Sequence, residues 1–202
     1  FFYYLLNLHI FLPTLHLVQT YRNMTKIVNL FGGPGIGKSS IASGLTYKLK
    51  KQHISCDNPY EFPKLLAWDE NHSAIRDQLF VLANQHRGIV KSYGKVDYII
   101  LDSPILLSLT YKSYYKSGIY PATLYGDNFD KMILDIHNQY ENINIVLSRC
   151  NGKHSDVERF QNLEESIELD SEIENTLKNN NLPYHKVKVN GRSVKNILDI
   201  IL

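Results

Sequence analysis

The chain has 202 residues, of which 44% are hydrophobic and 21% are charged, and this composition is ordinary for a globular protein of one domain. Its 22 Lys and Arg residues nearly balance 20 Asp and Glu residues, so the net charge is +2, and the sequence has no basic stripe of the kind that grips extended nucleic acid. The two cysteines, Cys56 and Cys150, exclude a disulfide framework and are typical of a reducing, cytoplasmic compartment.

An apolar segment, residues 1–23, precedes the rest of the chain. Polar residues and Pro13 interrupt it, and no small-residue cleavage site follows it. Met24 stands directly before the first expected strand. We therefore expect residues 1–23 to be an extension outside the fold and residues 24–202 to form the domain. A genuine membrane anchor in residues 1–23 is the alternative.

Strands and helices alternate after Met24. Apolar and β-branched runs predict strands at residues 26–31, 53–56, 96–101, 143–147 and 184–189. Segments with helical periodicity predict helices at residues 40–51, 64–69, 73–93 (with Asn71 or Ser73 as the cap), 106–115, 130–140, 163–179 and 193–202. About five such alternations predict an α/β fold in which helices cover both faces of a parallel sheet.

A glycine-rich turn joins the first strand to the first helix. Its sequence is GGPGIGKSS, over the residues Gly32, Gly33, Pro34, Gly35, Ile36, Gly37, Lys38, Ser39 and Ser40. Strand, GxxxxGK[ST] and helix in this order form a P-loop, whose backbone amides cradle phosphate oxygens at a helix N-terminus. The motif predicts a site for ATP, with Lys38 reaching the β- and γ-phosphates and the Ser39 hydroxyl ligating Mg²⁺.

An acidic residue ends the apolar run at residues 96–101. Asp102 is expected at the carboxyl edge of the sheet, beside the phosphate loop, where it would help to hold Mg²⁺. The alternative is that Asp102 caps the next helix. Ser103 and Pro104 follow, where an ATPase that does mechanical work commonly has a glutamate. This favours phosphoryl transfer to an acceptor over hydrolysis.

Glu61 follows the second expected strand and reaches the same edge of the sheet. A carboxylate there can accept the proton of an attacking hydroxyl, so Glu61 is the candidate catalytic base. Asp57 competes for this role, and a solvated turn residue is the alternative interpretation of Glu61.

Two arginines are candidates for stabilising the transferring phosphoryl group. Arg149 follows the fourth expected strand and Arg159 lies in the polar segment after it, which we expect to be a mobile loop. Lys153 and His154 are weaker candidates in the same segment. The alternative for each arginine is an ordinary surface position.

Further polar and aromatic side chains lie between these motifs. Gln78 and Gln85 are seven residues apart, so they share a helix face that could bind a substrate or form polar surface. Tyrosines could stack on a ring-containing acceptor or pack beneath a surface segment. They are Tyr111, Tyr114, Tyr115, Tyr120 and Tyr125.

The motifs together resemble a P-loop family typified by the nicotinamide-riboside kinase part of NadR, which includes small phage-encoded members. The resemblance covers residues 26–189 and rests on NLFGGPGIGKSS, YEFPKLLAWDE, DQLFVLANQHR, KVDYIILDSPILLSL and NIVLSR followed by Arg159. It implies the fold of nucleoside and nucleotide kinases, with ATP on the loop and an arginine-bearing lid after the fourth strand. Glu61-Phe62-Pro63-Lys64 stands where relatives often have an E-Y-A-K-like run.

These features predict a kinase that uses MgATP and a small acceptor: a nucleoside, a nucleotide or nicotinamide riboside. An ATP-dependent switch that controls a partner is the alternative. A polynucleotide 5′-kinase is disfavoured by the charge balance, and a GTPase by the lack of an N-K-x-D segment in the sequence.

Overall fold

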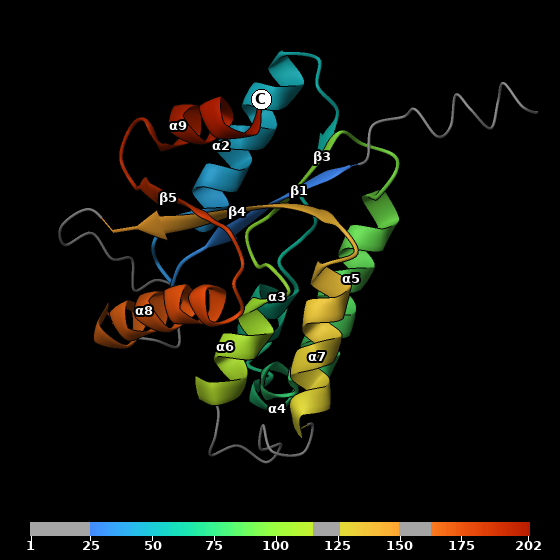
Figure 1. Cartoon of the computed structure of the whole chain (residues 1–202), viewed down its shortest axis with the longest axis vertical. Coiled ribbons are helices and arrows are strands. Elements are labelled where there is room, and N and C mark those ends of the chain that lie inside the picture. Colours follow the sequence, from blue (N-terminus) through green and yellow to red (C-terminus); the bar gives the residue numbers. More distant parts are fainter. Residues whose placement is uncertain (1–24, 115–125, 150–162) are drawn as a thin grey trace, which may run out of the picture.

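A single parallel sheet lies between two layers of helices in the computed structural model of the chain (Figure 1). The structure describes residues 25–114, 126–149 and 163–202. The sheet has five strands in the order β2-β3-β1-β4-β5. They are β1 (Lys26–Phe31), β2 (Cys56–Asp57), β3 (Tyr98–Leu101), β4 (Glu141–Ser148) and β5 (His185–Lys188). The predicted α/β fold with a five-stranded parallel sheet is confirmed.

Helices connect the strands in the alternating order that the sequence predicts. They are α2 (Lys38–Lys51), α3 (Phe62–Trp68), α4 (His72–Arg76), α5 (Gln78–Ser92), α6 (Leu107–Tyr114), α7 (Gly126–His137), α8 (Leu163–Asn179) and α9 (Ser193–Ile201). In Figure 1, α2 and α9 cover one face of the sheet, and α5, α6, α7 and α8 lie on the other. Among the described residues, every helix is too short or too polar to span a lipid bilayer.

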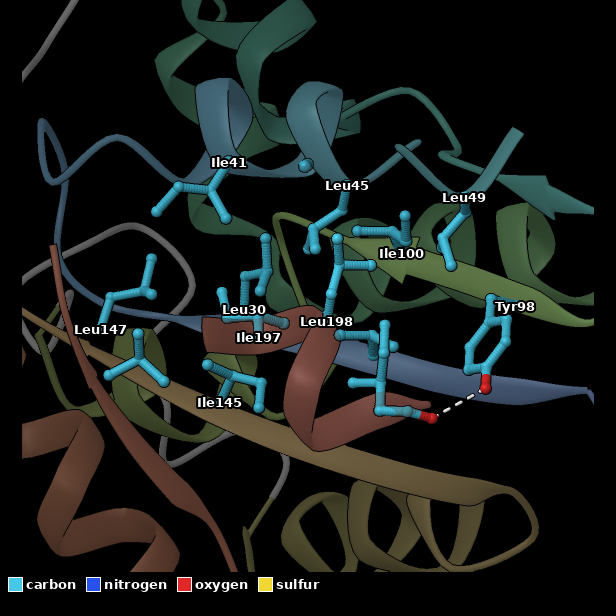
Figure 2. Packing of buried hydrophobic residues seen from close by; sticks show 14 of the residues in the cluster. Leu30, Ile41, Leu45, Leu49, Tyr98, Ile100, Ile145, Leu147, Ile197 and Leu198 are labelled. Carbon is cyan, nitrogen blue, oxygen red and sulfur yellow. Dashed lines mark hydrogen bonds between the residues drawn. The ribbon is translucent and has the colours of Figure 1, made fainter. Parts of the chain in front are cut away.

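The central strand β1 is buried from both sides, which explains its nearly continuous apolar sequence. Val28 and Leu30 join the core beneath α2 and α9, whereas Ile27 and Phe31 join the core on the opposite face. Figure 2 shows the first core, in which Leu45 of α2 and Ile197 of α9 meet the sheet. The P-loop therefore starts from the most deeply embedded strand.

Three asparagines form a buried network on β1 and β4. The Asn29 Nδ2 amide donates to Asn142 Oδ1 at 2.9 Å and to Asn144 Oδ1 at 3.0 Å. Asn144 in turn donates to the Pro183 carbonyl at 3.0 Å. Because buried amides need partners, these bonds favour the register in which Asn29 lies beside Asn144.

Two sequence predictions are wrong in their boundaries. The second strand is Cys56–Asp57 instead of 53–56, because His53 has a left-handed φ of 60° that ends the preceding helix. The long helix expected up to residue 93 is two helices, α4 and α5. Asp77 separates them with ψ 87°, and its carboxylate accepts the Phe80 amide as the cap of α5.

Smaller differences concern the ends of the other elements. Helix α7 begins and ends earlier than the expected 130–140, and β4 is longer than the expected 143–147. Helix α2 already includes Lys38 and Ser39. The extension expected over residues 1–23 lies outside the described residues.

Candidate functional site

The P-loop leads directly into helix α2 and leaves that helix without a side-chain cap. Gly37 is the residue before the helix, with a left-handed φ of 98° that favours glycine, and it has no side chain to bond the first amides of α2. Helix α2 has no acidic residue in its first turn. Its N-terminal amides and partial positive charge are therefore suited to an anion such as phosphate.

Lys38 folds back over the loop from the first residue of α2. Its ammonium donates to the Gly32 carbonyl at 2.7 Å and to the Gly33 carbonyl at 3.1 Å. Ser39 follows it and is half-buried at the start of the helix. The loop thus gathers a fixed cation, a hydroxyl and several amides at one place.

Asp102 lies at the carboxyl end of β3, the strand hydrogen-bonded to β1. Its side chain is buried, with a residue exposure of 6%. Helix α6 begins only at Leu107, so the alternative that Asp102 caps this helix is wrong. The Asp102 carboxylate and the Ser39 hydroxyl are the hard oxygen donors that Mg²⁺ prefers, and two protein ligands leave other coordination positions for water and phosphate. The donor set fits this ion.

The segment after Asp102 is held by helix α5. Gln85 Nε2 donates to the Ser103 carbonyl at 3.0 Å and to its hydroxyl at 2.8 Å. Gln78 is buried and donates to the Ile75 carbonyl at 2.8 Å. Neither glutamine forms the polar helix surface that was one of the two interpretations.

The two candidate bases have different surroundings. Asp57 lies in β2, and its carboxylate accepts a hydrogen bond from the Ser92 hydroxyl at the end of α5. Glu61 is the residue before α3, half-buried, and its side chain does not cap that helix. The Asp57 carboxylate is therefore bound to the end of α5, whereas Glu61 directly precedes α3. The role of Glu61 as the base stays a prediction.

Aromatic side chains flank Glu61 in the sequence and continue on α3 and α5. The Tyr60 and Trp68 rings are 6.5 Å apart and the Phe62 and Phe80 rings are 5.3 Å apart, both edge to face. Trp68 is 49% exposed and Phe80 is 43% exposed. Exposed aromatic rings such as these can pack against a planar ligand.

The tyrosine cluster expected from the sequence is described only in part. Tyr111 packs against the core that α5, α6, α7 and α8 share. The side chains of the other tyrosines in that cluster lie outside the described part of the chain, as do Lys153, His154 and Arg159.

Arg149 is tied to the phosphate loop by a carboxylate that the sequence analysis did not single out. Arg149 Nε lies 2.6 Å from Asp170 Oδ2, and Arg149 Nη2 donates to the Pro34 carbonyl at 2.8 Å. The Gly33 amide donates to Asp170 Oδ1 at 2.5 Å. The structure places Arg149 beside the loop, directly after β4. Asp170 is one of several acidic residues on α8, and nothing in the sequence pattern marks it.

The described residues contain no group of three or more His, Cys, Asp or Glu side chains that could hold a metal ion by themselves. A magnesium ion held by Ser39 and Asp102 would therefore need oxygens of a phosphate and of water to complete its coordination.

A comparison with known protein families identifies the family to which the chain belongs. The model of a family described as "AAA domain" matches residues 27–193, from the first strand to the start of the last helix. The chain belongs to this AAA domain family. No curated protein sequence matches the chain significantly.

Solved structures share the fold of this AAA domain. Deoxyadenosine kinase from M. mycoides with bound dATP superposes with a TM-score of 0.59 at 17% identity, over 87% of this chain and 98% of that one. NadR protein in complex with NR superposes with a TM-score of 0.63 at 12% identity, over 89% of this chain and 50% of that one. The chain therefore has the same α/β fold as these two structures.

Proposed function

We propose that this AAA domain is an ATP-dependent kinase that phosphorylates a small acceptor. The observation that carries the proposal is the uncapped N-terminus of α2, preceded by a glycine-rich loop and lined by Lys38. ATP would place its phosphates against residues 32–40, with Lys38 beside the β- and γ-phosphates. The fold shared with deoxyadenosine kinase and NadR supports this function.

Ser39 and Asp102 would hold Mg²⁺, which supplies positive charge to neutralise the phosphate oxygens during transfer. Asp102 is suited to this because it is buried beside the loop strand β1. Burial in a low-dielectric environment strengthens its interaction with a cation. Lys38 and Arg149 add further positive charge.

Glu61 would orient the acceptor hydroxyl and receive its proton. The aromatic residues around it favour an acceptor with a planar ring, such as a nucleoside, a nucleotide or nicotinamide riboside. Arg149 and Arg159 would stabilise the transferring phosphoryl group. The assignment of Arg159 rests on the sequence alone.

The test is phosphoryl transfer from γ-labelled ATP by the full chain to a panel of acceptors. The panel contains deoxynucleosides, ribonucleosides, nucleoside monophosphates, nicotinamide riboside and 5′-hydroxyl DNA. We expect a labelled small product and no labelled DNA. ATP binding without any labelled acceptor would contradict the kinase and favour the ATP-dependent switch.

A further inference from the structure

We propose that Asp170 is a positioning residue for phosphoryl transfer, which orients the Arg149 guanidinium beside the phosphate loop. The inference rests on the proposed kinase function. It assigns to Asp170 a role through Arg149 and Gly33, without contact to the substrate.

The Asp170 carboxylate divides its two oxygens between the loop and the arginine. Oδ1 accepts the Gly33 amide at 2.5 Å, and Oδ2 accepts Arg149 Nε at 2.6 Å. Arg149 Nη2 donates to the Pro34 carbonyl of the loop at 2.8 Å. Together these hydrogen bonds link the loop, helix α8 and the residue that follows β4. A planar guanidinium with two fixed acceptors is restricted to one orientation.

The third nitrogen of the guanidinium forms no hydrogen bond with the described residues. Arg149 Nη1 is buried and has no hydrogen-bond acceptor among them. A buried donor without a partner is costly, and a phosphate oxygen is the acceptor that would best complete it. Asp170 thus fixes a guanidinium that still has one donor available for a ligand beside the loop.

Burial makes the pair interdependent. The Arg149 side chain is 14% exposed and the Asp170 side chain is 22% exposed. Loss of the carboxylate would leave a largely buried positive charge without its counter-charge. The guanidinium would then adopt other orientations, and a displaced charge stabilises the transition state less well.

Gly33 shows how closely α8 approaches the loop. A Cβ atom built on Gly33 would lie 2.4 Å from the Ser166 carbonyl and 2.9 Å from Asp170 Oδ1. The Ser166 carbonyl belongs to the helix backbone and cannot rotate away. Glycine at this position is therefore required by the contact with α8.

Helix α8 does not depend on Asp170 to remain on the sheet. Its buried residues Leu169, Ile173 and Leu177 are each 1% exposed, and Ile173 and Leu177 belong to the core that α5, α6, α7 and α8 share. Burial of such apolar side chains is the main stabilising contribution to the packing of a helix on a sheet. A variant that lacks the carboxylate should therefore fold, and its effect on turnover can be measured.

The experiment compares Asp170→Asn with Glu168→Gln in the full chain. Glu168 is exposed on the same helix, so this control removes a similar charge without a contact to the loop. The side-chain oxygen of asparagine can still accept a hydrogen bond from the Gly33 amide. Its NH₂ group, which is a donor, then stands where Arg149 Nε requires an acceptor. We expect kcat to fall about 10- to 100-fold for Asp170→Asn, with the KM for ATP nearly unchanged. Glu168→Gln should behave as the wild type.

A double-mutant cycle with Arg149→Ala shows whether Asp170 acts through the arginine. If it does, Asp170→Asn should add little to the loss that Arg149→Ala causes. Losses that multiply would overturn the proposal, as would an unchanged kcat or an Asp170→Asn variant that does not fold. A wild-type chain that phosphorylates no acceptor would instead refute the kinase function on which the proposal rests.

Discussion

The ATP side and the acceptor side of the proposed site are formed by different kinds of chemical groups. The ATP side consists of the loop backbone, the start of α2 and a few charged side chains with short, mutual hydrogen bonds. The acceptor side consists of Glu61 and ordinary apolar rings on α3 and α5, several of them half exposed. The backbone and the charged hydrogen bonds fix the geometry of the ATP side. The shape of the acceptor side, by contrast, changes with each side-chain substitution.

This difference explains why the sequence predicts ATP as the phosphate donor of the proposed transfer but does not identify the acceptor. A backbone cradle demands glycines at set positions, which leave a visible motif. A pocket wall made of aromatic and aliphatic residues leaves no such pattern. Four substitutions test the contrast, from the largest expected effect to the smallest.

Lys38→Ala should remove the cation that faces the transferring phosphate. We expect kcat to fall by roughly 10³- to 10⁵-fold, while the fold persists because the sheet and its cores do not involve this side chain. Transfer from labelled ATP and thermal unfolding measure the two effects. Lys51→Ala, at the exposed end of the same helix, is the control. Full activity of Lys38→Ala would refute the ATP side as described.

Glu61→Gln should disable the acceptor side without affecting the ATP side. The amide cannot accept the proton of the attacking hydroxyl, so we expect kcat to fall by about 10²- to 10⁴-fold. ATP affinity, measured by isothermal titration, should stay unchanged. Glu70→Gln is the control, because Glu70 is exposed beyond the end of α3. If ATP affinity falls together with kcat, Glu61 belongs to the ATP side.

Asp102→Asn should weaken the hold on Mg²⁺. We expect kcat to fall by about 10²- to 10³-fold and the Mg²⁺ concentration for half-maximal activity to rise. Magnesium titrations of the transfer rate check both. Asp199→Asn on α9 is the matched control, because Asp199 is exposed and lies far from the loop along the chain. An unchanged Mg²⁺ dependence would remove Asp102 from the metal site.

Trp68→Ala should have the smallest effect and act only on the acceptor. Loss of one ring contact is worth about 0.5–1.5 kcal/mol, which corresponds to about a 2- to 10-fold increase in the KM of a ring-bearing acceptor. The KM for ATP should not change. Tyr47→Ala, an exposed ring on α2, is the control. An effect on ATP rather than on the acceptor would contradict the division between the two sides.

The sequence predicts the sheet well because its central strands are nearly continuous apolar runs and each is followed by a helix with clear periodicity. It misses the division between α4 and α5, because Asp77 interrupts a stretch whose apolar spacing still reads as helical. The cap competes with the helix through a local hydrogen bond that spacing does not reveal.

Within the candidate site, Lys38, Asp102 and Arg149 lie where strand ends predict them. Asp170 is absent from the sequence-based set because its partners are 137 and 21 residues away along the chain. An acidic residue on an acidic helix carries no sign of such contacts. Only the packing of α8 against Gly33 identifies it.

The asparagine network has a consequence for building chimeras with other proteins of this fold. It pairs Asn29 with Asn144, and the same alignment of β1 and β4 brings Pro34 and Arg149 within hydrogen-bonding distance. A slip of one residue would shift the strands by about 3.3 Å and turn their side chains to the opposite face. A graft that replaces one of these strands alone would remove the asparagine bonds that favour this register. The two strands should therefore be exchanged together.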